Sequence, residues 1–303
     1  MDSHFNNRVL ITGIGGFTGR HLKKHLEKQG MEVYGTTYTS SSMEDTFPVN
    51  LTDATSMLNV INKIEPNYII HLAAISFVGH GDAAEFYRVN VVGTENLLQS
   101  VIKSKANVKK VIVASSANIY GNTDVDLISE NFPPEPVNHY ACSKMAMEKI
   151  VANYYAKLPI IITRPFNYTG VGQAEHFLVP KIVSHFKQQK SEIELGNLDV
   201  YRDFSSVDFV VNAYAKLLQS DVKSEVFNIC SGNSYSLKQI IESLEAQAGY
   251  RINVSVNPDF VRADEVKKIT GDNSKLLKLF PDLKVIGLAE ILESMLLTSD
   301  STF

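Results

Sequence analysis

Residues 8–19 read RVLITGIGGFTG, an apolar run followed by glycines at positions 13, 16 and 19. The run is continuously apolar, as in a strand that is buried on both faces of a parallel sheet. In a strand–turn–helix unit, the glycines permit a tight turn, a close approach of the backbone to a pyrophosphate, and close packing of helix on sheet. N–H groups at the helix start then receive the phosphate charge. The stretch predicts a dinucleotide site, with contacts from Gly13, Gly16, Phe17, Thr18 and Gly19.

The rest of the first half alternates between short β-rich runs and helical stretches. Expected strands are 8–12, 32–36, 68–72, 110–114 and 160–164, and expected helices are 19–29, 54–64, 86–103 and 140–155. Such repetition builds a doubly wound sheet, which binds its ligand at the carboxyl ends of its strands. We therefore expect the α/β class: a Rossmann doubly wound parallel sheet with a smaller C-terminal substrate-binding lobe.

The second half is less regular and supplies that lobe. It contains a turn-rich segment at 163–173, helices near 179–189 and 207–218, a strand at 226–230 and an extended piece at 252–256. We expect the dinucleotide-binding domain to span residues 1–163, with 204–231 returning to it. The substrate-binding lobe is then formed by residues 164–203 and 232–303.

The end of the second expected strand bears on which dinucleotide is bound. An acid there would bind the adenosine ribose and favour NAD, whereas an arginine would favour NADP. Residues 35–42 read GTTYTSSS and contain neither, so no carboxylate repels a 2′-phosphate and hydroxyls such as that of Thr37 could hold one. NADP is favoured, with NAD as the alternative. Asn50 and Leu51 lie where the adenine edge is expected, although a polar turn before a helix explains them equally well.

Composition and charge exclude several classes of function. The chain has 303 residues and a net charge of −4, with no basic stretch that could follow a phosphate backbone, so nucleic acid is not an expected partner. Its two cysteines form no metal-binding pattern, so no metal site is expected. The apolar stretch 68–79 is too short to cross a bilayer, and the polar N-terminus does not resemble a signal peptide. These features predict a cytoplasmic protein without a membrane partner.

A tyrosine and a lysine four residues apart supply the candidate chemistry. Tyr140 and Lys144 would share one face of the expected helix 140–155. A phenol has a pKa of about 10, and a nearby ammonium lowers it by favouring the phenolate. Such a tyrosine can exchange a proton with a substrate oxygen while a nicotinamide exchanges hydride. Ser116, after the strand 110–114, could hydrogen-bond the same oxygen.

Five motifs in this order resemble the extended short-chain dehydrogenases/reductases, the group of nucleotide-sugar epimerases, dehydratases and reductases. They are the glycine triplet, HLAA at 71–74, NVxGT at 90–94, SSANIYG at 115–121 and YxxxK at 140–144. The resemblance implies that Ser116, Tyr140 and Lys144 are a catalytic triad, and that Tyr140 and Lys144 also contact the cofactor. It further implies that Ala73 and Ala74 line the cofactor groove. Asn90 is either a structural link near the active site or a plain buried helix asparagine.

The second half resembles nucleotide-sugar enzymes, and most of all the GDP-4-keto-6-deoxy-mannose reductases, which make GDP-D-rhamnose. The matching stretches begin at Thr163, Gly196, Asn228 and Arg262. This resemblance implies that Asn167, Arg202 and Arg262 hold the nucleotide diphosphate, since guanidinium forks bind phosphate oxygens in pairs. It also suggests that Ser76 or Tyr120 contacts the sugar, and that the helices 86–103 and 140–155 form a homodimer interface.

Two positions after the catalytic serine bear on the reaction. Sugar 4,6-dehydratases need an acid/base pair there, whereas Ala117 and Asn118 cannot exchange a proton. We therefore expect NAD(P)H-dependent reduction of the C4 ketone of a nucleotide-activated 6-deoxyhexose, with GDP-4-keto-6-deoxy-D-mannose as the preferred substrate and a GDP-D-rhamnose type of product. The alternatives are a nucleotide-sugar 4-epimerase and a non-catalytic cofactor-sensing regulator.

Overall fold

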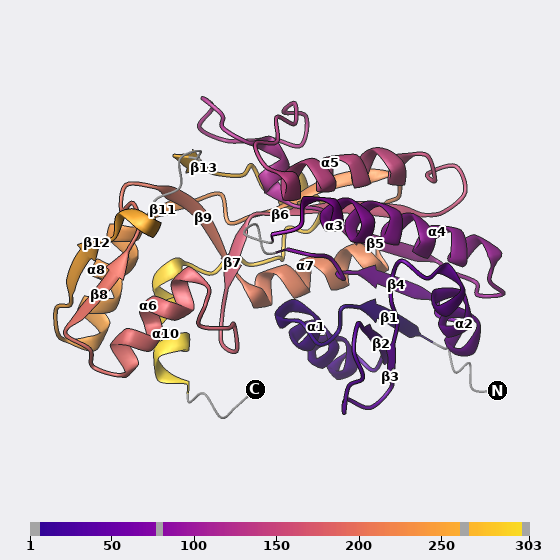
Figure 1. Ribbon diagram of the computed structural model, residues 1–303, viewed down its shortest axis with the longest axis horizontal. Helices are drawn as coiled ribbons and strands as arrows, with labels where there is room; N and C mark the ends of the chain where they lie inside the picture. Colours follow the sequence, from indigo (N-terminus) through magenta and orange to yellow (C-terminus); the bar gives the residue numbers. More distant parts are fainter. Residues whose placement is uncertain (1–6, 77–80, 261–266, 299–303) are drawn as a thin grey trace. The chain divides into compact units, whose positions relative to one another are not determined.

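The computed structural model describes residues 7–76, 81–260 and 267–298 of the chain (Figure 1). The chain divides into two compact units. Unit 1 comprises residues 1–119, 134–164 and 211–227, and unit 2 comprises 120–133, 165–210 and 228–303. The assignment of one region to the cofactor and another to the substrate stays a prediction.

A seven-stranded sheet forms the centre of unit 1. Its order is β10-β6-β5-β4-β1-β2-β3, in which the chain order reverses between β1 and β4. The strands are β1 (Arg8–Thr12), β2 (Glu32–Thr37), β3 (Thr46–Pro48), β4 (Tyr68–His71), β5 (Lys110–Ala114), β6 (Ile160–Pro165) and β10 (Glu225–Ile229). The pairings from β3 through β6 are parallel. In open sheets of this kind the ligand crevice lies outside the carboxyl ends of the strands at such a reversal.

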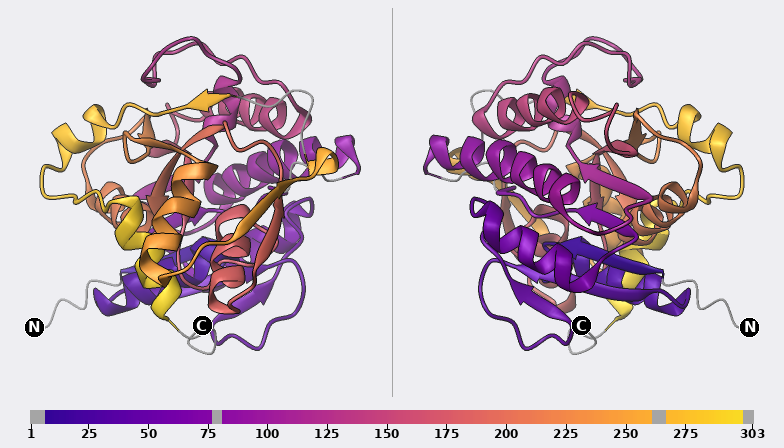
Figure 2. Two further views of the ribbon diagram at one scale, coloured as in Figure 1. Left: turned by 90° about the vertical axis from the view of Figure 1, so that its left-hand side faces the viewer. Right: turned by 90° about the vertical axis from the view of Figure 1, so that its right-hand side faces the viewer.

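The strands are apolar on both sides because helices cover both faces of the sheet. Leu10 of β1 joins a core cluster with residues of α2 (Ala54–Ile64), α4 (Gly93–Lys103) and α5 (His139–Ala152). Helices α4 and α5 lie side by side in Figures 1 and 2. Val9 and Ile11 alternate with Leu10 and are equally buried on the other face. The helix α1 (Phe17–Lys28) follows the glycine turn, and α7 (Val207–Gln219) precedes β10.

The expected single helix over 86–103 is instead three consecutive segments. They are α3 (Ala83–Tyr87), the π-helical turn η1 (Arg88–Val92) and α4. At the end of η1 the N–H of Gly93 bonds the carbonyl of Arg88, five residues earlier. A π turn accommodates one extra residue within a helix and often occurs at a functional site. Here it contains the fully buried Asn90.

Unit 2 has two small sheets and a layer of helices (Figure 1). One sheet has the order β11-β9-β13, with β7 also paired to β9, and β8 pairs with β12 in the other. The strands are β7 (Asn167–Thr169), β8 (Glu192–Leu195), β9 (Tyr201–Ser206), β11 (Ser234–Ser236), β12 (Asn253–Val256) and β13 (Lys268–Ile269). Helices α6 (Leu178–Lys187), α8 (Leu237–Ala248) and α10 (Leu288–Leu297) share one apolar core. The shorter segments of unit 2 are η3 (Pro258–Phe260) and α9 (Ser274–Leu279), and η2 (Ala117–Tyr120) runs from the end of one stretch of unit 1 to the first residue of unit 2.

The predicted fold class is confirmed by this parallel sheet with its flanking helices. The helix expected over 19–29 begins two residues earlier, at Phe17, because the glycine turn already ends at Gly16. The small strands of unit 2 other than β12 were not predicted. Among the described residues, no helix is both long enough and apolar enough to cross a membrane.

Candidate active site

The glycine turn leaves β1 with backbone packed directly on backbone. Gly13 has φ +74°, and a Cβ atom there would lie 2.9 Å from the amide nitrogen of Ala73. A Cβ at Gly19 would lie 2.5 Å from the carbonyl oxygen of Gly13. Neither distance is possible for a side chain, so both glycines are required by the close approach of the turn, the loop after β4 and the start of α1. This is the shape that a dinucleotide pyrophosphate needs, and it brings Ala73 against the turn.

Other predicted cofactor residues border this turn. A Cβ at Gly15 would lie 3.2 Å from the methyl group of Thr37, so the end of β2 lies beside the turn. Gly16 is the N-cap of α1 and has no side chain with which to bond the first N–H groups of the helix. The guanidinium of Arg20 donates to the carbonyl of Gly15 at 3.0 Å, which braces the turn from outside.

Asn50 and Leu51 form a turn that joins β3 to α2. The side-chain oxygen of Asn50 accepts from both the amide and the hydroxyl of Thr52, at 3.0 and 2.8 Å. The carbonyl of Leu51 accepts from Asn96 at 3.0 Å, and a Cβ at Gly93 would lie 2.8 Å from the Cβ of Leu51. The turn is therefore held by its own bonds and by α4, and its contact with an adenine stays a prediction.

Ser116 and Lys144 are linked through the end of β5. The ammonium of Lys144 donates to the carbonyl of Ala114 at 2.8 Å, two residues before Ser116. The hydroxyl of Ser116 accepts from the amide of Asn118 at 3.2 Å. Burial lowers the pKa of Lys144 to about 8, against the opposing charge of Glu148. A buried amine with a pKa near neutrality can bind as a cation or exchange a proton.

Tyr140 lies one turn before Lys144 on α5. Asn138 caps this helix by accepting from the amide of Ala141 at 2.9 Å, which fixes where the helix begins. The Tyr140 ring is 8% exposed and packs against Phe86 of α3, with ring centroids 6.1 Å apart. The three predicted catalytic residues thus all lie in unit 1, after β5 and on the first turns of α5.

An ion pair behind Lys144 was not predicted. Arg164, at the end of β6, donates through Nε and Nη2 to the two carboxylate oxygens of Glu148, at 2.9 and 2.7 Å. Both side chains are only 8% exposed. A two-pronged bond of this kind satisfies both buried charges. Glu148 lies four residues after Lys144, so Arg164 holds this carboxylate in place one turn below the lysine, where it opposes the effect of burial on the lysine pKa.

Asn90 connects the loop after β4 to α5. Its side chain accepts from the amide of Ile75 at 2.9 Å and donates to the Ile75 carbonyl at 3.1 Å. It also donates to the hydroxyl of Ser143 at 3.0 Å, and Ser143 donates to the carbonyl of Tyr140 at 2.7 Å. These bonds agree with the structural link that the resemblance implied. The exposed Ser76 directly follows Ile75.

Two predicted diphosphate residues lie on adjacent strands of unit 2. Asn167 of β7 pairs in register with Phe204 of β9, two residues from Arg202 on the same strand. Between them on β9, Asp203 is fully buried and accepts from the amides of Ser231, Gly232 and Gly271 and from the Ser231 hydroxyl. This network, which was not predicted, pins the strand that carries Arg202. Arg262 lies outside the described residues.

Tyr120 does not fit the suggested role as a sugar contact. It is fully buried, and its hydroxyl donates to the side chain of Asn228 at 2.7 Å. Its ring packs against Phe132 and Phe166. A phenol that is enclosed and bonded in this way belongs to the core of unit 2, so that suggestion was wrong, and Ser76 stays the candidate.

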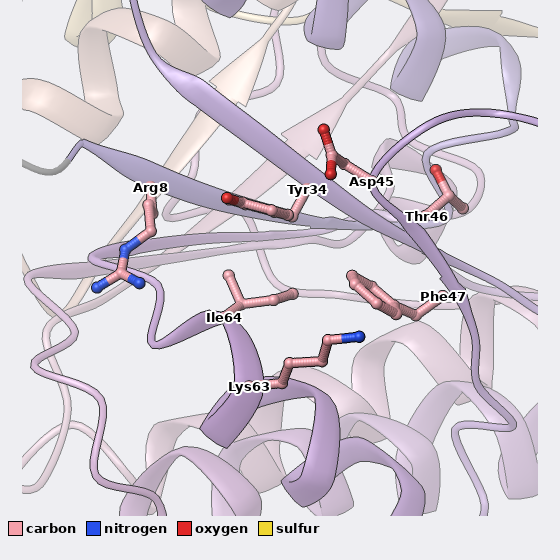
Figure 3. A pocket seen from close by; sticks show the side chains of 7 residues that line it. All are labelled: Arg8, Tyr34, Asp45, Thr46, Phe47, Lys63 and Ile64. Atoms are coloured by element: carbon pink, nitrogen blue, oxygen red, sulfur yellow. The ribbon is translucent and has the colours of Figure 1, made fainter.

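A cavity of about 410 Å³ in unit 1 is separate from these residues (Figure 3). Its lining includes Arg8 at the start of β1, Tyr34 in β2, and Phe47 and Lys63. The ammonium of Lys63 lies 4.6 Å from the centroid of the Phe47 ring. Arg8 is at the opposite end of β1 from the glycine turn, so the cavity is not part of the candidate active site.

The family of the chain follows from comparison with known proteins. A family model described as GDP-mannose 4,6 dehydratase matches residues 10–295. This chain belongs to the GDP-mannose 4,6-dehydratase family. The identification as an extended short-chain dehydrogenase/reductase is thereby confirmed. The family's name describes a dehydration, whereas Ala117 and Asn118 of this member provide no acid/base pair.

Two similar proteins are named for GDP-linked 6-deoxy sugars. GDP-6-deoxy-D-talose 4-dehydrogenase of Aggregatibacter actinomycetemcomitans is 40% identical over 290 residues, which cover 95% of this chain and 96% of that protein. GDP-6-deoxy-D-mannose reductase of Pseudomonas aeruginosa is 30% identical over 284 residues, which cover 89% of each.

Solved structures of similar proteins share the whole fold. A Burkholderia cenocepacia J2315 protein, provisionally described as an epimerase, matches with a TM-score of 0.90 at 41% identity, over 96% of this chain and 97% of that one. RMD from Pseudomonas aeruginosa, solved with NADPH, matches at 0.83 and 26% identity, over 96% and 97%. UDP-glucose 4-epimerase of Thermus thermophilus, solved with NAD, matches at 0.83 and 25% identity, over 95% and 97%.

Proposed function

We propose that this protein reduces the C4 ketone of a GDP-linked 4-keto-6-deoxyhexose with a nicotinamide cofactor. The observation that carries the proposal is the combination of Ser116, Tyr140 and Lys144 at the carboxyl ends of a Rossmann sheet with a glycine turn shaped for a pyrophosphate. The relative that is 40% identical over nearly the whole chain supports the GDP-sugar and the C4 position.

The residues of unit 1 have distinct roles in this reaction. A nicotinamide cofactor held at the glycine turn would supply the hydride for C4. Tyr140 gives its hydroxyl proton to the C4 oxygen, so that the ketone becomes a secondary alcohol and the tyrosine becomes a phenolate. The ammonium of Lys144, held by the Ala114 carbonyl, stabilises that phenolate from one turn away. Ser116 donates a hydrogen bond to the same C4 oxygen as negative charge develops on it.

The sugars in the names of the two relatives share one C4 ketone. Talose and mannose differ only in configuration at C4, so oxidation at C4 of either 6-deoxy sugar gives the same ketone. The enzyme's product therefore depends on which face of that ketone is turned toward the hydride. The 40% relative favours the 6-deoxy-D-talose product over the 6-deoxy-D-mannose (D-rhamnose) product that was expected from the sequence.

Dehydration does not suit the residues next to Ser116. Removal of water across C5 and C6 requires one group to take a proton and another to give one. Ala117 is buried and has no titratable group, and the amide of Asn118 cannot replace it. We therefore propose that the 4-keto sugar is the substrate of this protein and not its product.

Three finer assignments accompany the proposal. NADP is preferred to NAD because Thr37, whose methyl group lies beside the glycine turn, also carries a hydroxyl, and residues 35–42 contain no carboxylate that would repel a 2′-phosphate. The protein is a homodimer formed through α4 and α5, as the family resemblance implies. We also assign it to the cytoplasm, as the sequence predicts.

The cofactor balance tests the function. We expect GDP-4-keto-6-deoxy-D-mannose and NADPH to give one oxidised cofactor for each GDP-6-deoxyhexose, because a reductase regenerates no hydride. Absorbance of the reduced nicotinamide gives the first quantity, and NMR of the sugar gives the second together with the C4 configuration. UDP- and dTDP-linked ketosugars are the matched controls, and we expect them to react at least tenfold more slowly. Oxidation of cofactor without a new secondary alcohol would contradict the proposal.

The 4-epimerase is the second candidate, because the Burkholderia structure carries that provisional description. An epimerase oxidises C4, turns the ketosugar over and reduces its other face, so it regenerates its own cofactor. The same assay separates the two. Interconversion of GDP-6-deoxy-D-talose and GDP-6-deoxy-D-mannose with no net change in added cofactor would identify an epimerase.

Arg202 gives a test of substrate binding. We expect Arg202→Ala to raise the KM for the GDP-sugar by about 10- to 100-fold, the effect of losing one hydrogen bond to a charged group. Cofactor affinity should not change, since the cofactor is assigned to unit 1. Steady-state kinetics and a cofactor titration measure both quantities. Arg251→Ala, which removes an exposed arginine of the same unit, is the control. A KM within twofold of wild type in Arg202→Ala would remove the arginine from the diphosphate site.

A further inference from the structure

A buried histidine lies at the point where the strand order of the sheet reverses. His71 is the last residue of β4, in register with Thr12, the last residue of β1. It is 2% exposed. Its Nδ1 lies 2.7 Å from the hydroxyl of Thr12, and its Nε2 lies 2.9 Å from the hydroxyl of Thr94 on α4. Thr12 immediately precedes the glycine turn, so the ring joins the start of the cofactor site to α4.

The hydroxyl groups determine where the ring carries its hydrogen. Thr94 donates its only hydroxyl hydrogen to the Asn90 carbonyl at 2.7 Å, so its oxygen can only accept from His71. Nε2 must therefore be protonated. The Thr12 hydroxyl already accepts from the amide of Ala73 at 3.2 Å, which leaves its hydrogen for Nδ1. The bonds therefore require a hydrogen on Nε2, and the neutral ring with that hydrogen also offers Nδ1 as the acceptor for the Thr12 hydroxyl hydrogen.

These hydrogen bonds run in series from the glycine turn to α5, the helix that carries Tyr140. The series runs from the Ala73 amide through Thr12, His71 and Thr94 to the carbonyl of Asn90. The side chain of Asn90 continues it to Ser143, which bonds the carbonyl of Tyr140. The π turn presents both the carbonyl and the side chain of Asn90 to this series.

We infer that His71 is a positioning residue, whose neutral ring with hydrogen on Nε2 holds the glycine turn and the Tyr140 helix in one hydrogen-bonded frame. The consequence for catalysis rests on the proposed function, whereas the consequence for cofactor binding does not. The Thr12 half of the frame acts on the cofactor turn, and the Thr94 half acts on the alignment of Tyr140. Burial, and secondarily the charge of Lys144, lowers the pKa of His71 to about 3, so the ring stays neutral across the working pH range.

Two substitutions of His71 should each keep one half of the hydrogen-bonded frame and remove the other. In His71→Asn the short amide can occupy the Nδ1 position and keep Thr12, whereas in His71→Gln the longer amide can reach the Nε2 position and keep Thr94. We expect His71→Asn to lower kcat by about tenfold with cofactor Kd within threefold of wild type, because a lost buried hydrogen bond has an effect of this size. His71→Gln should show the reverse: Kd raised by about tenfold and kcat at saturating cofactor within threefold. Equal effects on both quantities in both variants, or no effect, would overturn the inference.

If the His71 variants fail to fold, two variants of Thr94 and an NMR spectrum of the wild-type protein test the same inference. Thr94→Val should lower kcat as His71→Asn does. Thr94→Ser, which keeps the hydroxyl, should have a kcat within threefold of wild type. In the wild-type protein, long-range proton–nitrogen NMR should show the His71 hydrogen on Nε2 from pH 8 down to about pH 4. A hydrogen on Nδ1, or a charged ring at pH 7, would overturn the assignment. The spectrum and the cofactor titration decide the inference even if the GDP-ketosugar proves not to be the substrate.

Discussion

Replacement of Tyr140 by phenylalanine should lower kcat for reduction of the ketosugar by roughly 10²- to 10⁴-fold, the usual contribution of a positioned acid. Phenylalanine keeps the ring contact with Phe86 and loses only the hydroxyl. Without it, the C4 oxygen has no proton donor at the moment of hydride transfer. Cofactor affinity should stay within threefold of wild type, because the glycine turn is untouched. Single-turnover kinetics with saturating NADPH isolates the chemical step.

Tyr154→Phe is the matched control for this experiment. Tyr154 is also 8% exposed, follows the end of the same helix, and donates its hydroxyl to Glu95 at 3.0 Å. Its replacement removes one phenolic hydroxyl with its hydrogen bonds to Glu95 and Gln99, so the cost to folding should be at least comparable. We expect kcat to stay within threefold of wild type. Equal loss of activity in the two variants would show that Tyr140 acts through stability and not as the acid.

A carboxylate in the glycine turn should abolish cofactor binding. At Gly16 a Cβ atom would lie 3.3 Å from the carbonyl oxygen of Gly13, a contact that small shifts can relieve. Gly16→Asp should therefore fold, while its negative charge at the N-terminus of α1 repels the pyrophosphate. We expect the Kd for NADPH to rise by at least about 100-fold, because a buried like-charge contact costs several kcal/mol. Isothermal titration calorimetry with either dinucleotide measures it.

Gly287→Asp makes the same change in charge at the N-cap of another helix. Gly287 precedes α10 in unit 2, where a Cβ atom would meet nothing within 4 Å. Aspartate is favoured at an N-cap, so this variant should fold and bind NADPH as wild type does. If folded Gly16→Asp also bound NADPH normally, the cofactor would have to lie elsewhere.

Elements with strong local signals could be predicted to the residue. The strand 8–12 and the helix 54–64 have the bounds that the sequence indicated. The first is an unbroken apolar run in front of a glycine turn. The second begins after Asp53, whose side chain accepts from the amides of Thr55 and Ser56 at the helix start. In both cases the determining contacts lie within a few residues of one another.

The π turn could not be predicted, because its reasons are distant in sequence. The period of residues 86–103 fits an ordinary helix, and nothing local marks the extra residue. The turn is held by bonds of Asn90 to Ile75, 15 residues away, and to Ser143, 53 residues away. The same holds for the small strands of unit 2. Strand β9 reads YRDFSS, which is too polar to predict, and it forms because β7, β11 and β13 pair with it.

The sequence predicted which residues form the candidate site, but not the ion pairs and hydrogen bonds that hold them in place. Motif spacing located Ser116, Tyr140 and Lys144, because chemistry constrains their identities. It did not reveal that Glu148 and Arg164 pair behind the lysine, or that Asp203 anchors the strand carrying Arg202. His71 was visible only as the first letter of a motif. Its partners Thr12 and Thr94 lie 59 and 23 residues away, so only the register of β1 with β4 brings them together.

The chain passes between the two units five times, at residues 119, 133, 164, 210 and 227. During synthesis on the ribosome, some strands of unit 1 are therefore made well before the strands that pair with them. The sheet of unit 1 ends in β10, which pairs with β6 although roughly 60 residues, most of them belonging to unit 2, are made between the two strands. Until Glu225–Ile229 has emerged, β6 presents an open edge that can pair with a foreign strand. A nascent chain that stops at Arg164 therefore contains the three proposed catalytic residues, Ser116, Tyr140 and Lys144, and yet exposes an unpaired strand edge. Neither unit can be expressed from a single uninterrupted segment of the gene.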